Sequence, residues 1–167
     1  HQGNPPSDEL SEVSFSLLLN LASVCNPEDK SVLWGFISQY AEGATAEKFP
    51  RLDALAGYAV RYYHDFVKPM KKYRAATELE QKALSHLVTL LKEHTVPEEG
   101  ETIAGHLMSK VYTVGREHYG KEKMRDWFKA QYETLLGQEQ GPRMGSFFAL
   151  YGVGESIALI ERALQGE

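Results

Sequence analysis

The sequence predicts an all-α fold, a helical bundle or cage of six to eight helices. Apolar residues recur at three- and four-residue spacing along most of the 167-residue chain, which is typical of amphipathic helices. No segment alternates apolar and polar residues between two turn signals, as a strand would. No motif of fixed length repeats either, which argues against the common helical solenoids.

The first two helices are expected to form a hairpin. An apolar stripe in residues 15–25 has helical spacing. Asn26 and Pro27 then supply an N-cap and a first-turn proline for the next helix. The two acidic residues that follow interact favourably with the positive end of its dipole. Gly43 is expected to end this second helix.

The third and fourth helices are expected in the middle of the chain. The third begins near Pro50 and runs to the neighbourhood of Lys68, where Pro69 breaks it. The fourth begins at Thr77, because Glu80 three residues later completes a capping box.

The remaining helices follow a loop at residues 94–101. A fifth helix is expected over residues 102–117, and a sixth over 121–136, which Gly137 ends. Short helices then follow, the last over about 155–164.

Two boundaries follow from the same pattern. Residues 1–6 are expected to be disordered or left over from cloning, and residues 7–167 to form the helical region. If this region divides into two subdomains, the boundary is expected near the loop at 94–101.

Composition and charge exclude several classes of protein. The net charge of −5 argues against nonspecific coating of nucleic acid, which depends on many cations. No apolar run is long enough to cross a bilayer, and the N-terminus has no signal-peptide pattern. Cys25 is the only cysteine, which fits a cytoplasmic protein. It ends an apolar stripe, so it is expected to be a small buried residue rather than a nucleophile.

No catalytic, metal or cofactor site is expected in this chain. Glu-x-x-His, His-x-x-x-His, Gly-x-Gly-x-x-Gly and Walker motifs are all absent. Five histidines are expected to be surface or packing residues. They are His64, His86, His94, His106 and His118.

A basic–aromatic stretch covers residues 61–74, RYYHDFVKPMKKYR. It holds five basic residues and one acidic residue, interleaved with four aromatic rings. A solvated helix end explains the lysines, because the helix dipole favours cations there. The same ingredients also suit single-stranded nucleic acid, since cations bind phosphates and rings stack on unpaired bases. On the second interpretation Lys71, Lys72 and Arg74 are the candidate phosphate contacts.

A second candidate region is LLGQEQGPRMGSFFALYG, residues 135–152. Gln138, Gln140 and Arg143 can hydrogen-bond base edges or a phosphate, and Phe147 or Tyr151 can stack on a base. Position by position, a structural role explains these residues better: a rigid Gly-Pro turn, core aromatics, and an arginine that caps a neighbouring helix. Their combination in one segment is what favours binding.

These stretches, with their surroundings, carry a family resemblance. SFSLLLNLASVCNPEDKSVLWGFISQY (14–40) and MRDWFKAQYETLLGQEQGPRMGSFFALYGVGESIALIERAL (124–164) closely resemble the C-terminal region of class I lysyl-tRNA synthetase. The likeness covers nearly everything after about Ser7. A weaker likeness exists to the anticodon-binding part of glutamyl-tRNA synthetases, which has a similar helical cage.

The resemblance implies an anticodon-binding domain that is detached here from its catalytic half. Its partners would be the uridine-rich anticodon loop of lysine tRNA and the catalytic domain of the full-length chain, which uses ATP to join lysine to its tRNA. The signature motifs of that catalytic domain have no counterpart here, so the fragment should be inactive alone. The alternatives are a helical protein-interaction module, which would use Phe147 and Phe148, and an independent helical enzyme, which no constellation of residues supports.

Overall fold

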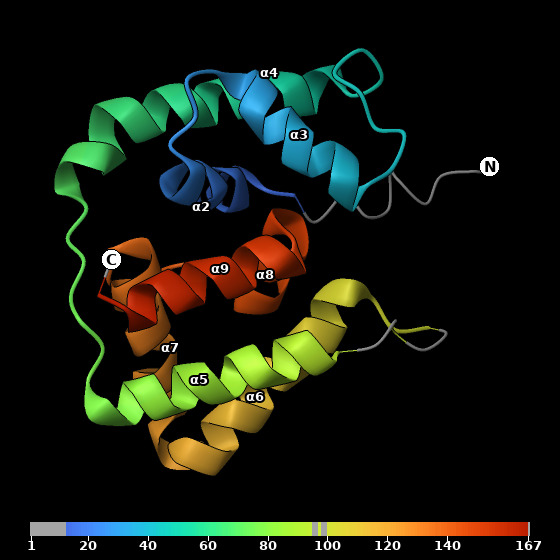
Figure 1. Cartoon of the computed structure of the whole chain (residues 1–167). Coiled ribbons are helices and arrows are strands. Elements are labelled where there is room, and N and C mark those ends of the chain that lie inside the picture. Colours follow the sequence, from blue (N-terminus) through green and yellow to red (C-terminus); the bar gives the residue numbers. More distant parts are fainter. Residues whose placement is uncertain (1–12, 95–96, 98–99, 167) are drawn as a thin grey trace. The chain divides into compact units, whose positions relative to one another are not determined.

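A computed structural model describes residues 13–94, 97 and 100–166. All regular elements in these residues are helices, eight of them α-helices, which confirms the all-α prediction (Figure 1). The described chain divides into two compact units. Unit 1 holds residues 13–70 and 150–152, and unit 2 holds residues 71–149 and 153–166. The division therefore falls after Met70, whereas 94–101, part of which lies outside the described residues, is within unit 2. The expectation for residues 1–6 also falls outside the described residues.

Unit 1 is built from α2 (Phe15–Cys25), α3 (Lys30–Tyr40) and α4 (Pro50–Tyr62). Helix α2 packs against α3 and α4, because each presents an apolar stripe that must be removed from water. The fully buried residues of this core include Leu18, Leu21, Leu33, Ile37 and Ala56.

The turn between α2 and α3 differs from the expectation. Asp29, not Asn26, caps α3, and its side chain accepts a hydrogen bond from the N–H of Ser31 at 2.8 Å. Asn26 instead ends α2 in the left-handed conformation with φ of 45°, which short polar side chains tolerate. Burial raises the pKa of the neighbouring Cys25 thiol to about 11, so this residue holds little nucleophilic thiolate at neutral pH.

The α4 helix continues beyond Tyr62 in altered geometry. A π-helical turn, η1 (Tyr63–Val67), and a 3₁₀ turn, η2 (Lys68–Met70), carry it through Pro69. The helical segment therefore ends at Met70, one residue beyond the proline at which the break was expected. Helix α3, by contrast, ends at Tyr40, before Gly43, which lies in the following turn with φ of 88°.

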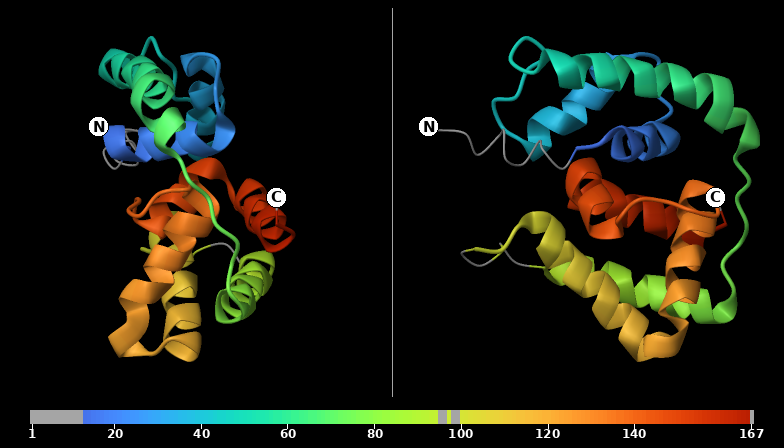
Figure 2. Two further views of the ribbon diagram at one scale, coloured as in Figure 1. Left: turned by 90° about the vertical axis from the view of Figure 1, so that its left-hand side faces the viewer. Right: turned by 180° about the vertical axis from the view of Figure 1, so that it is seen from behind.

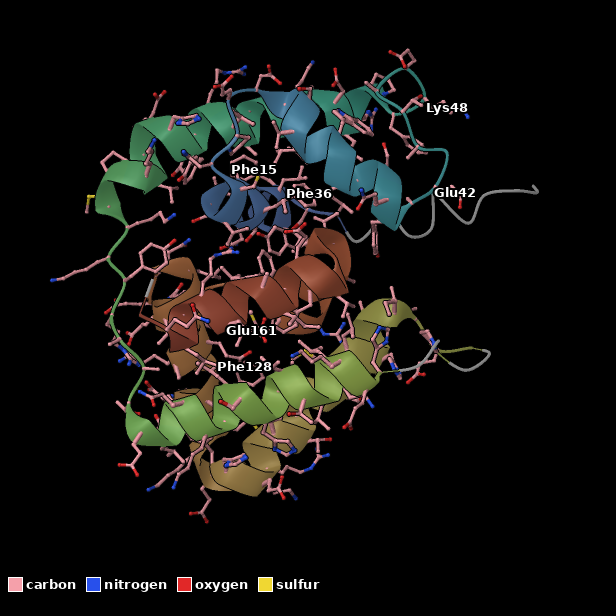
Figure 3. All side chains as sticks on the ribbon, in the orientation of Figure 1. Phe15, Phe36, Glu42, Lys48, Phe128 and Glu161 are labelled. Carbon is pink, nitrogen blue, oxygen red and sulfur yellow. The ribbon has the colours of Figure 1, made fainter. Side chains whose placement is uncertain are left out.

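Unit 2 begins with a non-helical segment, residues 71–77, followed by α5 (Glu78–Glu93). Thr77 caps α5, and Thr77 and Glu80 form both hydrogen bonds of the expected capping box. Helix α5 packs against α6 (Ile103–His118) and α9 (Val153–Leu164). Lys92 of α5 pairs with Glu161 of α9 at 3.2 Å; Figure 3 labels Glu161.

The rest of unit 2 leads to the candidate site. A 3₁₀ turn, η3 (Lys121–Lys123), precedes α7 (Met124–Gln131), which turns back beside α6 (Figure 2). The helix then continues as a π-helical turn, η4 (Tyr132–Leu136), which stops at Gly137 as expected. Helix α8 (Met144–Tyr151) follows, and its last two residues belong to unit 1.

Helix α8 is seated against α6 at a glycine. The N–H of Gly145 donates to Sδ of Met108 at 3.3 Å, and a Cβ on Gly145 would collide with the carbonyl oxygen of Ala104. This close approach orders the residues that follow the loop at 137–143. No helix in the described part of the chain is long and apolar enough to span a membrane.

Candidate nucleic-acid interface

Two segments that lie far apart in the sequence meet in unit 2. The first is the basic segment (residues 71–74), and the second is the Gly-Pro-Arg loop (residues 137–143). The backbone N–H of Lys72 donates to the carbonyl of Gly137 at 2.9 Å. The ring of Tyr73 lies against Gly137, since a Cβ placed there would be 3.1 Å from Cε2 of that ring. The two segments therefore form one continuous surface.

Tyr132 fixes the Gly-Pro-Arg loop at both ends. At the start, the N–H groups of Gly137 and Gln138 both donate to the carbonyl of Tyr132. At the end, the Tyr132 hydroxyl donates to the carbonyl of Pro142 at 3.0 Å, and its ring leaves no room for a Cβ on Gly141. Burial raises the pKa of Tyr132. The hydroxyl therefore stays a neutral donor, and the loop is held in one shape.

Gly137 is the point where a side chain should disturb this junction most. Its φ of 69° lies in the left-handed region, and an added Cβ would press on the Tyr73 ring. We expect Gly137→Ala to lower the free energy of unfolding by about 1–2 kcal/mol, measured by urea denaturation.

Gly154→Ala is the matched control for this change. Gly154 lies in α9 and has no positive φ, and a Cβ added to it would meet no atom within 4 Å. Alanine there should be neutral or stabilising by up to about 1 kcal/mol. If both variants changed the free energy of unfolding equally, the junction at Gly137 would tolerate a side chain without strain.

Arg74 links α5 to η4 within unit 2 through two ion pairs. Nη1 and Nη2 donate to the two carboxylate oxygens of Glu80 at 2.7 and 2.8 Å, and Nε donates to Glu133 at 2.7 Å. The bonds to Glu80 and, second, to Glu133 raise the pKa of Arg74. The bond from Arg74 lowers the pKa of Glu80. The expected role of Arg74 as a phosphate contact therefore does not fit, because all three guanidinium nitrogens already bind protein carboxylates.

The other polar candidates lie on or beside the joined surface. Lys72, Gln140 and Arg143 are exposed, and Gln138 is half-buried. The Lys71 ammonium lies 5.0 Å from the centroid of the Tyr73 ring, a cation–π distance. Among the residues that the structure describes, no ion pair or side-chain hydrogen bond engages Gln140 or Arg143.

The stacking role expected for Phe147 or Tyr151 does not fit the structure either. Phe147 is 0% exposed and Tyr151 is 5% exposed, so neither offers a ring face to a base. Phe148 is also 0% exposed, which removes the apolar face that a protein-interaction module would use. Tyr73 is 50% exposed and lies within the joined surface. Tyr73 is one of the four rings of the basic–aromatic stretch, but it was not predicted to be the stacking residue. Its position after Pro69, beyond the expected end of the helix, was the signal that its ring could be exposed.

Comparison with known protein sequences points to one family. The chain is 52% identical, over its whole length, to the lysine–tRNA ligase of Roseobacter denitrificans. It is 48% identical to that of Rickettsia bellii and 45% identical to that of Rickettsia felis, each over 98% of this chain. In each case it spans about 30% of the ligase's length. No family model and no solved structure matches it.

Proposed function

Because this chain belongs to the lysine–tRNA ligase family, whose members it matches over about 30% of their length, we propose that it binds the anticodon loop of lysine tRNA. It would form the C-terminal, anticodon-binding region of a class I enzyme. The lysine-joining reaction would take place in the catalytic region of the longer chain, with ATP, and the fragment alone would be inactive. The proposed location is the cytoplasm.

The observation that supports this proposal most is the junction of the basic segment with the Gly-Pro-Arg loop. It brings the Lys71 ammonium and the backbone of Lys72 to the half-exposed ring of Tyr73 and to Gly137. Arg143, at the other end of the loop that begins at Gly137, is a third exposed cation. Cations of this kind bind phosphates, and an exposed ring can stack on an unpaired base. A surface that combined only charge would not distinguish an open loop from a duplex.

The glutamines supply the remaining chemistry. Uracil presents two carbonyl acceptors and one N–H donor, and an amide side chain offers both a donor and an acceptor. Gln140 is exposed and Gln138 is half-buried on the same loop. We therefore assign base-edge contacts to Gln138 and Gln140, stacking to Tyr73, and phosphate contacts to Lys71, Lys72 and Arg143.

Binding of a labelled lysine-tRNA anticodon stem-loop, followed by fluorescence anisotropy, tests this proposal. With three phosphate contacts the affinity should fall with salt at a log–log slope of roughly −2. Tyr73→Ala should weaken binding by about 1–3 kcal/mol, the usual value of one base–ring stack. Arg143→Ala and Lys72→Ala should each weaken binding and reduce the salt slope.

Arg125→Ala is the matched control, because Arg125 is an exposed cation in the same unit. It lies twelve residues before Gly137 along a helical segment, about 18 Å away. Its loss should leave binding unchanged. The proposal fails if the folded protein does not bind the stem-loop at low salt, or if Arg125→Ala weakens binding as much as Arg143→Ala does.

A further inference from the structure

A cluster of metal-ligating side chains lies on the pair of helices α5 and α6. His86 belongs to α5, and Glu117 and His118 form the end of α6. Nδ1 of His86 lies 3.0 Å from Nε2 of His118 and 3.1 Å from Oε2 of Glu117. One ligand atom from each residue lies within 4.8 Å of the other two.

Hydrogen bonding does not satisfy this arrangement fully. Nδ1 of His86 carries either one proton or one lone pair. If it carries a lone pair, it can accept from His118 but then faces the carboxylate oxygen of Glu117 without a proton between them. If it carries a proton, that single proton faces two acceptors. A cation placed among the three atoms would accept a lone pair from each of them.

The two separations from Nδ1 of His86 are close to those that such a cation needs. Zinc binds imidazole nitrogen at about 2.0–2.1 Å and carboxylate oxygen at about 2.0–2.2 Å, so neighbouring ligand atoms of a tetrahedral site lie roughly 3.3–3.4 Å apart. The two separations in the cluster, 3.0 and 3.1 Å, need only small side-chain rotations to reach these values.

We propose that His86, Glu117 and His118 bind a divalent transition metal, zinc in the first place, and thereby link α5 to α6. Two imidazoles and a carboxylate favour zinc, nickel or copper over magnesium or calcium. The cluster is partly open, with the Glu117 side chain 62% exposed, so water can complete the coordination. The C-terminal end of α6 also carries negative partial charge that favours a cation.

The proposal revises the sequence-based expectation for two histidines. His86 and His118 were expected to be surface or packing residues because no single helix carries a metal motif. The ligands come from two helices that pack together, so their convergence has no signature in either helix alone.

Zinc titration of metal-free protein, with a chromophoric chelator as competitor, tests the site. We expect saturable binding of one zinc ion per chain, with a rise in Tm as zinc is added. His86→Ala and His118→Ala should each weaken zinc binding by more than about tenfold, since removal of a supporting residue alone costs about 10–100-fold. Glu117→Gln should weaken binding while keeping the size of the side chain.

His94→Ala is the matched control, a half-buried histidine of unit 2 two helical turns beyond His86, about 12 Å away. It should bind zinc like the unchanged protein. Circular dichroism of each variant without metal separates lost binding from lost folding, and the absorption of bound cobalt reports the ligand set independently. The proposal is overturned if no saturable binding occurs, or if a folded variant lacking both His86 and His118 binds zinc as tightly as the unchanged protein.

Discussion

Phe147→Ala is expected to lower the free energy of unfolding by about 3–5 kcal/mol, the usual cost of truncating a fully buried phenylalanine. The ring is 0% exposed and lies 6.0 Å from that of Phe148, centroid to centroid. Its removal therefore loses apolar burial and leaves a cavity that the surrounding helices fill only in part. Urea denaturation followed by circular dichroism measures the change.

Tyr73→Ala is the comparison that separates packing from recognition. Its ring is half exposed, so the expected stability loss is below about 1 kcal/mol, while RNA affinity should fall. If Phe147→Ala instead remains stable and abolishes RNA binding, the Phe147 ring must open toward the RNA. The stacking role first expected from the sequence would then return to it.

Arg74→Ala should have the next largest effect. The guanidinium contacts the carboxylates of Glu80 and Glu133, whose side chains are only 12% and 18% exposed. Removing one partner of a fully buried pair costs about 3–5 kcal/mol. Solvent reaches the Arg74 side chain, which is 37% exposed, so we expect a smaller loss of about 1–3 kcal/mol. The stability of Arg74→Lys should lie between that of the unchanged protein and that of Arg74→Ala. Lysine keeps the charge, but its ammonium cannot form the two parallel hydrogen bonds to the Glu80 carboxylate.

The effect of Arg74 should also depend on pH. Arg74 holds the pKa of Glu80 below its usual value. A depressed carboxyl pKa contributes stability above the pKa of the unfolded chain, about 4.3 for glutamate, and loses it as the pH falls through the folded value. The difference in urea midpoint between the unchanged protein and Arg74→Ala should therefore shrink from pH 7 to about pH 3. A constant difference would mean that packing, not charge, makes up the contribution of Arg74.

Helix ends with local signals were predictable from the sequence. The capping box of Thr77 and Glu80 and the stop at Gly137 depend on residues within four positions, and both are confirmed. The start of α3 was placed wrongly because Asn26 and Asp29 are both good caps. The choice between them depends on where α2 ends, which the sequence does not state.

The candidate site was predictable in its parts but not in its assembly. Charge and aromatic content marked the basic segment and the Gly-Pro-Arg loop, but only the hydrogen bond from Lys72 to Gly137 brings them together. Arg74 was assigned to phosphate because the sequence shows its charge and not its partner Glu133, 59 residues away. Burial of Phe147 is likewise a tertiary property, since the same pattern suits a core helix and an exposed recognition face.

The membership of residues 150–152 in unit 1 bears on how the chain is made. The ring centroid of Tyr151 lies 5.3 Å from that of Phe36, although all other parts of unit 1 precede residue 71. During synthesis, α2, α3 and α4 leave the ribosome long before Tyr151 does. The contact between Tyr151 and Phe36 can therefore form only after the whole of α8 has emerged. A protease cut after Met70 would release an N-terminal piece that lacks the tyrosine it packs against.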